Sequence, residues 1–295
     1  MSRRTTQLRQ LLLRPTALLA PGAFGPMPAK LAERAGFEAV YLPGGGSALN
    51  RLGVADVGVF TMTEMVDSAR AVAESVSVPV ICDADSGFGN HLNVQRAVRE
   101  YERAGVAAIH IEDQTFPKRS GHFSGKSLVA TEEAVQKIKA AVAARSDPDF
   151  IIIARCDAMS VGGFDEVVRR CTAYHEAGAD MLFVEAPNSI EIITKIPQVI
   201  PGTHLFNMSA GGSTPALTID EVTRLGYRMM IMPNFSSLVT IRAVREMYAE
   251  IRQTGSVAGI RERAATFREF MELGDFDTYE AADHAFAASA PKKSS

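Results

Sequence analysis

The sequence is poor in cysteine and has no long apolar run. Its three cysteines, Cys82, Cys156 and Cys171, form no Cys-x-x-Cys pair and have no histidine at a zinc-ligand spacing. This argues against a structural zinc site and a disulfide scaffold, and it favours a reducing compartment. The longest purely apolar run, residues 150–154, is far shorter than the ~20 residues that cross a bilayer. We therefore expect a soluble protein without a membrane partner.

An excess of charge of either sign is also missing. The chain of 295 residues has 31 basic and 34 acidic residues and a formal net charge of −3. This balance is unlike that of a nucleic-acid-binding protein, and 46% hydrophobic residues is too many for a disordered chain. We expect one large or two ordinary domains and no nucleic-acid partner.

Acidic residues are absent from the first 32 positions, which contain five basic residues. This composition is similar to that of a mitochondrial presequence. The apolar spacing in residues 6–13 favours instead an amphipathic helix that packs against the bottom of the domain through Leu8, Leu11 and Leu12. We expect a cytoplasmic protein, with a mitochondrial location as the alternative in a eukaryote.

Eight short apolar runs alternate with segments of helical period. The runs are residues 17–20, 39–42, 78–83, 108–112, 150–155, 181–185, 204–207 and 229–232. They are continuously apolar, which is typical of parallel strands buried on both faces. A doubly wound open sheet would share this pattern, but eight βα units in roughly 250 residues favour an α/β fold of the (β/α)8 TIM-barrel type.

The C-terminal part departs from this alternation. We expect a barrel domain of residues 1–256, a helical extension of residues 257–290 and a disordered tail of residues 291–295. The extension has more apolar residues, Phe267 and Phe270 among them, than a free tail would carry. It packs either on the barrel's own helices or on another subunit.

Acidic residues follow two predicted strands that lie next to each other. Asp83 and Asp85 are two apart on one strand and point the same way, and Glu112 ends the neighbouring strand. Three converging carboxylates repel one another unless a cation neutralises them, so we expect Mg2+, with Mn2+ as the alternative. Alternatively, Asp85 caps the following helix and the side chain of Asp113 points away from the site.

Other candidates are a strand-end arginine, a glycine-rich loop and a long basic segment. Arg155 can bind a substrate carboxylate, form a salt bridge to Glu185 or Glu112, or do both. Residues 44–47 offer backbone N–H groups to a carboxylate or an oxyanion. No lysine ends a predicted strand, which disfavours Schiff-base chemistry. Segment 114–126 is either a lid over an anionic substrate or a solvated loop.

Six motifs carry a resemblance to a known family. They are Tyr41-Leu42-Pro43-Gly44-Gly45-Gly46, Asp83-Ala84-Asp85-Ser86-Gly87-Phe88-Gly89, His110-Ile111-Glu112-Asp113-Gln114, Lys118-Arg119-Ser120-Gly121-His122, Ile153-Ala154-Arg155-Cys156-Asp157-Ala158 and Glu185-Ala186. Over almost its whole length, the chain resembles the isocitrate lyase/phosphoenolpyruvate mutase superfamily. It is most similar to the branch with 2-methylisocitrate lyase, 2,3-dimethylmalate lyase and carboxyphosphonoenolpyruvate mutase.

This resemblance implies a TIM barrel whose C-terminal helix is exchanged between subunits of a homotetramer, a dimer of dimers. It implies Mg2+ near Asp56, Asp83, Asp85 and Glu112. Together with the strand-end residues, it assigns substrate binding to Pro43, Gly44, Gly45, Ser47, Arg119, Gly121, Asn207 and Ser209. It assigns catalysis to Lys118, Ser120, His122, Arg155 and Glu185.

Three positions depart from the pattern of the family's carbon–carbon lyases. Pro43 replaces a small polar residue, Cys156 replaces a threonine, and Ser120 replaces a loop cysteine. In the implied reaction a 2-hydroxy acid breaks between C2 and C3, and the cysteine thiol protonates the resulting carbanion. A serine hydroxyl is a much weaker acid than a thiol, whose pKa is near ~8.5, so His122, Lys118 or water would have to replace it.

We expect an Mg2+-dependent carbon–carbon lyase. Its small-molecule carboxylate substrate is a 2-hydroxy di- or tricarboxylate like 2-methylisocitrate, and its products are pyruvate or a related 2-oxo acid and a carboxylate such as succinate. Ser120 leaves alternatives open: an inactivating replacement, an oxaloacetate decarboxylase or hydrolase, a phosphonomutase, or a weakly active or binding-only relative.

Overall fold

Eight parallel strands form the core of the structure, a computed structural model that describes residues 3–119 and 125–288. Each strand lies within two residues of a run that the sequence predicts. The strands are β1 Leu18–Pro21, β2 Val40–Leu42, β3 Val80–Asp83, β4 Ala108–Glu112, β5 Ile151–Cys156, β6 Met181–Val184, β7 His204–Asn207 and β8 Met229–Met232.

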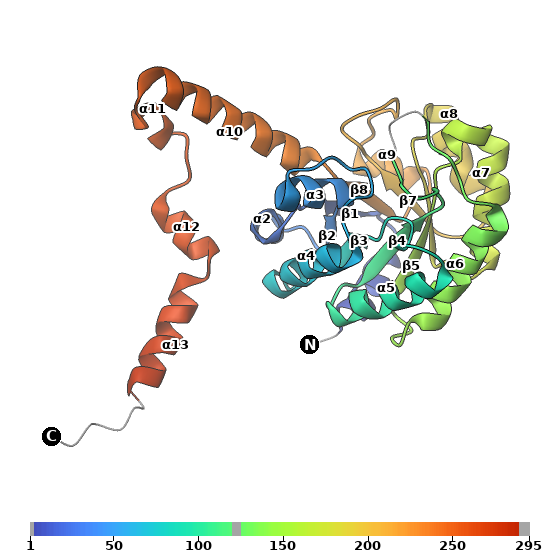
Figure 1. Ribbon diagram of the computed structural model, residues 1–295, viewed down its shortest axis with the longest axis horizontal. Helices are drawn as coiled ribbons and strands as arrows, with labels where there is room; N and C mark the ends of the chain where they lie inside the picture. Colours follow the sequence, from blue (N-terminus) through green and yellow to red (C-terminus); the bar gives the residue numbers. More distant parts are fainter. Residues whose placement is uncertain (1–2, 120–124, 289–295) are drawn as a thin grey trace. The chain divides into compact units, whose positions relative to one another are not determined.

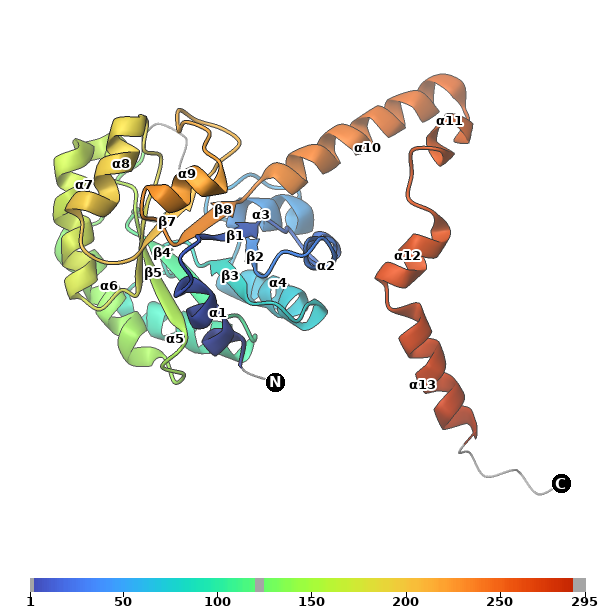
Figure 2. The ribbon, with the colours of Figure 1, turned by 180° about the vertical axis from the view of Figure 1, so that it is seen from behind.

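Helices follow the strands and surround them (Figures 1 and 2). The helices of this part are α1 Arg4–Leu12, α2 Pro26–Arg34, α3 Gly44–Leu52, α4 Met62–Ser75, α5 His91–Arg103, α6 Thr131–Ala144, α7 Met159–Glu176, α8 Ile190–Val199 and α9 Ile219–Arg224. Capping boxes begin α4 at Thr61 and α5 at Asn90, because each side chain accepts a hydrogen bond from the third helical N–H. Among the described residues, no helix is long and apolar enough to cross a membrane.

The strands pair in the order β1-β8-β7-β6-β5-β4-β3-β2, and a bridge between Gly22 and Tyr41 joins the two ends. The Ala23 N–H donates to the Tyr41 carbonyl over 2.8 Å. Gly22 is required at this junction, since an added Cβ would lie 2.0 Å from the carbonyl oxygen of Pro233. The predicted TIM barrel is therefore confirmed, and the doubly wound alternative is wrong.

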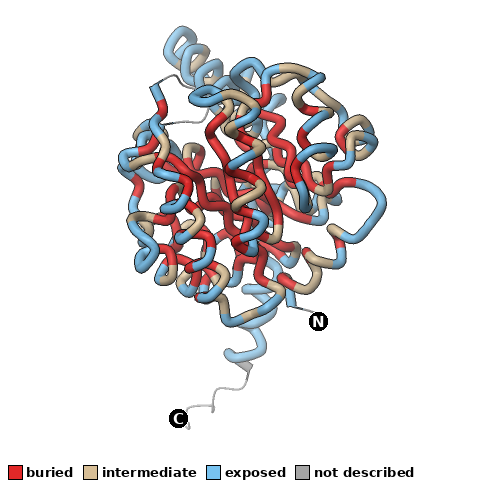
Figure 3. Tube along the Cα trace, turned by 90° about the vertical axis from the view of Figure 1, so that its right-hand side faces the viewer, coloured by how far each residue is buried: buried red, intermediate tan, exposed pale blue. Residues whose placement is uncertain are grey.

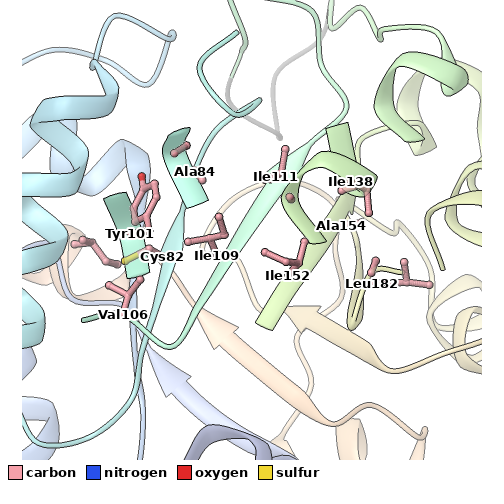
Figure 4. Packing of buried hydrophobic residues seen from close by; sticks show 14 of the residues in the cluster. Cys82, Ala84, Tyr101, Val106, Ile109, Ile111, Ile138, Ile152, Ala154 and Leu182 are labelled. Carbon is pink, nitrogen blue, oxygen red and sulfur yellow. The ribbon is translucent and has the colours of Figure 1, made fainter. Parts of the chain in front are cut away.

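Apolar side chains alternate between the inside and the outside of the barrel. In β5, Ile151 and Ile153 join the inner apolar cluster, whereas Ile152 and Ala154 join the outer one. Figure 4 shows this outer layer, in which Ile152 and Ala154 lie near Ile138 of α6. Every residue of β5 is buried, and Figure 3 shows the same burial throughout the strands. Burial of both faces explains why the sequence shows continuous apolar runs.

Helix α1 packs where the sequence predicts. Leu8 and Leu11 are buried in the inner cluster, and Leu12 packs partly against it. Polar contacts hold the same helix, because Thr5 donates to Asp147 over 2.8 Å and Arg9 pairs with Asp180 at 2.9 Å. The helix therefore packs at the bottom of the barrel, at the amino ends of the strands.

The barrel unit ends at Leu238, and a second compact unit begins at Val239. Its helices are α10 Phe235–Thr254, which begins in the barrel unit, α11 Ala258–Arg261, α12 Phe267–Leu273 and α13 Phe276–Ala288. No residue from 239 to 287 is buried. In this respect α10 differs from the barrel helices, which contribute buried residues to a shared core. The predicted tail, residues 291–295, lies outside the described residues.

Candidate active site

Five charged or amide side chains that the sequence predicts as site residues lie at the carboxyl ends of consecutive strands. Asp83 ends β3, Glu112 ends β4, Arg155 lies near the end of β5, Glu185 follows β6 and Asn207 ends β7. All five are buried. Burying charged groups is costly unless they are paired, so their gathering at one end of the barrel indicates a functional site.

Asp83 and Asp85 converge, although not for the reason that strand alternation suggests. Strand β3 ends at Asp83, and Asp85 lies in the turn beyond it with a φ of 44°. A Cβ added to Gly44 would lie 2.8 Å from Oδ2 of Asp83 and 3.4 Å from Oδ1 of Asp85. The N-cap of α5 is Asn90, so the alternative in which Asp85 caps this helix is wrong.

Lys118 reaches this acidic group from the long segment after β4. Its Nζ lies 2.7 Å from Oδ1 of Asp85 and also forms an ion pair with Asp56. Burial raises the pKa of Asp85 to about 6, although the Lys118 ammonium opposes the shift. A lysine therefore enters the site even though no lysine ends a strand.

Glu112 has the least compensated charge of the site. Its two carboxylate oxygens are buried, and neither has a hydrogen-bond partner within residues 3–119 and 125–288. The nearest cation is Nη2 of Arg155, at 3.4 Å from Oε2. Burial raises the pKa of Glu112 well above its ordinary value, although Arg155 and Lys118 oppose this. Two buried carboxylate oxygens without a hydrogen-bond partner are what a site that receives a cation would present.

The geometry sets a limit on how a metal ion can bind here. In the part of the chain that the structure describes, no three Asp, Glu, His or Cys side chains form a cluster that could hold one ion directly. Mg2+ usually retains several waters and takes only one or two carboxylates from the protein. Glu112 fits such a mostly hydrated ion, because neither of its oxygens has a hydrogen-bond partner among the described residues.

Arg155 is oriented mainly by Asp157. Nε of Arg155 lies 2.8 Å from Oδ2 of Asp157, and Nη2 lies 3.1 Å from Oδ1. The guanidinium also lies over the ring of Phe183, 5.1 Å from its centroid. The salt bridge to Glu112 is one of the alternatives that the sequence left open. Asp157 therefore occupies the edge of the guanidinium that carries Nε and Nη2.

Glu185 and Asn207 form a pair across β6 and β7. Nδ2 of Asn207 donates to Oε2 of Glu185 over 3.1 Å. Oδ1 of Asn207 is buried and has no hydrogen-bond partner among the described residues. Ser209, two residues after Asn207, is buried, and its hydroxyl oxygen accepts a hydrogen bond from the Gly211 N–H over 3.3 Å. The pair leaves an amide oxygen to accept a hydrogen bond.

The glycine-rich residues begin α3 beside the acidic group. Pro43 is the N-cap residue, and the Gly44 N–H donates to Oδ2 of Asp83 over 3.2 Å. A Cβ on Gly45 would lie 3.1 Å from Cβ of Asp56, so a glycine allows the start of α3 to lie this close to Asp56. Ser47 donates its hydroxyl proton to the Pro43 carbonyl over 2.7 Å. The positive end of α3 therefore supports the carboxylates.

Tyr41 and His110 belong to the site but were not predicted as site residues. The Tyr41 hydroxyl lies 2.8 Å from Nε2 of His110, which lies 3.7 Å from Oδ1 of Asp83. Burial lowers the pKa of His110 to about 4, so its ring is neutral at pH 7. Both residues belong to motifs that carry the family resemblance. Their positions on β2 and β4, with side chains directed into the barrel, are the signal that could have identified them as site residues.

Two predicted neighbours of the site point outward. Asp113 accepts a hydrogen bond from the Tyr174 hydroxyl over 2.7 Å and pairs with Arg170 at 3.1 Å, which confirms that its side chain points away. Cys156 joins the outer apolar cluster together with Cys171 of α7. The replacement of the usual threonine at this position therefore does not reach the inner side of the barrel.

The predicted basic segment is only partly described. Ser120, Gly121 and His122 lie outside the described residues. Arg119 is described, and its N–H donates to Oε1 of Gln114 over 3.0 Å. The structure thus brings together Asp56, Asp83, Asp85 and Lys118, and it joins Arg155 to Glu112 and Glu185 to Asn207. The roles assigned to these residues stay predictions.

Comparison with known proteins identifies relatives over nearly the whole chain. The family model described as phosphoenolpyruvate phosphomutase matches residues 8–252. A 2,3-dimethylmalate lyase of Eubacterium barkeri is 46% identical over 281 residues, which cover 95% of this chain and 97% of the relative. A 2-methylisocitrate lyase of Aeropyrum pernix is 41% identical and covers 94% of this chain and 89% of its own.

Solved structures agree with this similarity. A crystal structure of 2,3-dimethylmalate lyase has a TM-score of 0.92 and 35% identity, and the match covers 100% of this chain and 99% of that one. Phosphonopyruvate hydrolase in complex with oxalate and Mg++ has a TM-score of 0.87 and 33% identity, over 96% and 99% of the two chains. The predicted resemblance is confirmed: the chain belongs to the phosphoenolpyruvate mutase/isocitrate lyase superfamily, and it is an enzyme, a carbon–carbon lyase.

Proposed function

We propose that this lyase cleaves the C2–C3 bond of a 2-hydroxy di- or tricarboxylate similar to 2-methylisocitrate or 2,3-dimethylmalate. The products are pyruvate or a related 2-oxo acid and a carboxylate such as succinate. The observation that carries the proposal is the buried Glu112, which lies beside the Arg155 guanidinium and has no hydrogen-bond partner for either oxygen among the described residues. This combination suits a substrate that brings a carboxylate for the arginine and a cation for the glutamate.

The proposed cation is Mg2+, with Mn2+ as the alternative. Glu112, Asp83, Asp85 and Asp56 would hold it, mostly through water. A bound ion would act as a Lewis acid that stabilises the negative charge on the C2 oxygen of the substrate when its hydroxyl proton is lost, while the carbanion is left on the other fragment. The Lys118 ammonium pairs with Asp85 and Asp56 and would share these two carboxylates with the ion.

The protein's own groups orient the substrate and manage protons. Arg155 binds the C1 carboxylate, and Gly44 and Gly45, which begin α3, are the proposed contacts for the carboxylate and the oxo group. The Oδ1 of Asn207 accepts a hydrogen bond, so it suits a hydroxyl or a protonated carboxyl group, with Glu185 fixing the amide. Ser120 and His122 are the proposed proton donors to the carbanion, together with Lys118.

Product analysis tests this function. We expect pyruvate or another 2-oxo acid from a panel of 2-hydroxy di- and tricarboxylates when Mg2+ is present, and none after treatment with EDTA. Calorimetry with Mg2+ alone gives a readout that does not depend on turnover, and Glu112→Gln should weaken this binding. The proposal fails if neither this chain nor its Ser120→Cys variant releases a 2-oxo acid.

A second candidate function is a hydrolase, decarboxylase or phosphonomutase on the same scaffold. Ser120 favours it, since these reactions do not require a thiol that protonates carbon. The similarity to phosphonopyruvate hydrolase, 33% over nearly the whole chain, is consistent with it. NMR spectroscopy of product mixtures from oxaloacetate and phosphonopyruvate decides, because unchanged spectra for both compounds exclude this candidate.

We propose that the enzyme is a homotetramer, a dimer of dimers in which the C-terminal helices are exchanged between subunits. Residues 239–287 bury none of their side chains, and Phe267, Phe270 and Tyr279 are 76%, 69% and 72% exposed. Met27 and Leu31 on α2 are also about half exposed, at 52% and 51%. A second copy of the chain would cover such apolar side chains. The division into residues 1–256 and 257–290 stays a proposal.

Disrupting the apolar face of α12 tests this assembly. We expect Phe270→Asp to raise the dissociation constant of the oligomer at least ~100-fold, because a buried aromatic anchor is replaced by a charge. Analytical ultracentrifugation over a range of concentrations measures the change. Arg268→Asp on the same helix is the matched control and should leave the oligomer largely intact. A monomer for the unchanged chain at micromolar concentration would contradict the proposal.

A further inference from the structure

Asp157, which was not predicted as a site residue, is the meeting point of three buried side chains. It is fully buried just beyond β5. Besides the two hydrogen bonds from Arg155, its Oδ1 accepts one from Nζ of Lys126 over 3.0 Å and one from Nε2 of Gln114 over 3.3 Å. The Lys126 side chain is only 1% exposed, so the ion pair is shielded from water. One carboxylate therefore compensates two buried cations.

Gln114 and Lys126 belong to the two ends of the segment that contains Lys118. Gln114 binds the backbone of Arg119 twice, since its Nε2 donates to the Arg119 carbonyl over 2.9 Å and its Oε1 accepts from the Arg119 N–H over 3.0 Å. The ends also pair as an antiparallel ribbon, in which the Thr115 N–H donates to the Ser127 carbonyl over 2.9 Å. Both described ends of the segment are thus attached to the group that orients Arg155.

Asp157 is itself held in place by α7. Its N–H donates to Oδ1 of Asp113 over 2.8 Å. Arg170 of α7 pairs with the other oxygen of Asp113 and donates to the Val129 carbonyl over 3.0 Å. The backbone of Asp157 is therefore tied to the barrel through Asp113, while its carboxylate joins Arg155 to the segment.

We propose that Asp157 is a positioning residue with two linked tasks: it orients the Arg155 guanidinium toward the substrate carboxylate, and it anchors the two described ends of segment 114–126 through Gln114 and Lys126. The first task rests on the proposed function, in which Arg155 binds substrate. Without the Asp157 charge, the buried Arg155 and Lys126 cations both lose a carboxylate partner, and Arg155 is drawn toward Glu112, which lies 3.4 Å away. Substrate binding and the position of Lys118 would then be lost together.

Three variants separate these tasks. Asp157→Asn removes the charge but keeps the shape, and Lys126→Met removes one anchor but keeps the Arg155 pair. Asp180→Asn is the matched control, because Asp180 accepts from Arg9 at 2.9 Å and from Arg145 at 2.6 Å at the opposite end of the barrel. Two measurements apply to each purified full-length variant: the rate of trypsin cleavage after Lys118 or Arg119 without ligand, and the Kd of oxalate with Mg2+ by calorimetry.

For Asp157→Asn we expect cleavage at least ~10-fold faster and a Kd about 100-fold higher, since a misplaced binding group costs roughly two orders of magnitude. For Lys126→Met we expect faster cleavage but a Kd within about threefold of the unchanged chain, because Arg155 keeps Asp157. Asp180→Asn should lower the melting temperature and change neither readout. A merely structural role for Asp157 would instead make its variant behave like this control.

The two tasks can be overturned separately. An unchanged oxalate Kd in Asp157→Asn overturns the orientation of Arg155, and an unchanged cleavage rate in Lys126→Met overturns the anchoring. If Asp157→Asn does not fold, Gln114→Leu takes its place in the cleavage assay, and Arg155→Lys, which cannot form the bidentate pair, takes its place in calorimetry. If even the unchanged chain does not bind oxalate, the proposed function fails, while the cleavage rates still decide the anchoring.

Discussion

The Ser120→Cys variant is expected to release 2-oxo acid from its 2-hydroxy acid substrate ~10²- to 10⁴-fold faster than the unchanged chain, the range in which a positioned general acid acts. Cleavage of the C2–C3 bond leaves a carbanion that has to be protonated on carbon. A thiol with a pKa near ~8.5 donates this proton far more readily than a serine hydroxyl does. Steady-state kcat with a saturating substrate measures the gain.

Ser120→Ala is the matched control, since it removes the hydroxyl without adding an acid. If serine contributes no proton, this variant keeps the low lyase rate of the unchanged chain, and the acid is His122, Lys118 or water. A loss of oxaloacetate or phosphonopyruvate turnover in Ser120→Ala, without a lyase gain in Ser120→Cys, would instead assign the serine to the second candidate function. No gain in Ser120→Cys would contradict the proposed position of the acid.

Replacing Arg155 by methionine is expected to lower kcat/KM by about 10³-fold or more. Two losses combine: the carboxylate of the substrate loses its bidentate partner, and Asp157 and Glu112 lose a buried cation. Breaking one side of a buried ion pair typically costs about 3–5 kcal/mol, so the free energy of unfolding should fall as well. Enzyme kinetics together with urea unfolding of the same preparation measure both effects.

Arg155→Lys separates the two losses. It retains a positive charge near Glu112, so stability should recover in part, but an ammonium cannot present two parallel N–H groups to a carboxylate. Arg145→Lys is the control, because Arg145 pairs with Asp180 at 2.6 Å far from the site and should leave kcat/KM unchanged. Nearly full activity in Arg155→Lys would show that charge alone, and not orientation, is required.

Patterns that depend on near neighbours in the chain were predicted well. The eight strands appear where the continuous apolar runs lie, because burial on both faces is encoded within a few residues. The positions of Asp83, Glu112 and Arg155 at the mouth of the barrel follow directly, since a strand's end in the sequence is its end in the barrel. Asp113 was the exception, and its outward direction was foreseen as an alternative.

Contacts between distant parts of the chain were beyond the sequence. Asp85 lies beyond β3 and converges with Asp83 through a turn of positive φ, which alternation along a strand does not describe. Lys118 reaches Asp85 and Asp56 from a loop, so the search for strand-end lysines did not find it. Asp157 has the same spacing from Arg155 as Asp85 has from Asp83, yet its role depends on Gln114 and Lys126, which only folding brings to it.

The sequence by itself determined the barrel, the family and the list of carboxylates that line one end of the sheet, because each of these is encoded in local order and composition. Only the tertiary structure decided how those charges are compensated. Lys118 pairs with Asp85 and Asp56, and Asp157 pairs with Arg155 and Lys126. Glu112 has no hydrogen-bond partner among the described residues and only a 3.4 Å ion pair with Arg155. The reason is physical. The pairing of buried charges depends on distances of a few ångströms between elements far apart in the chain, and these distances exist only after the barrel has closed.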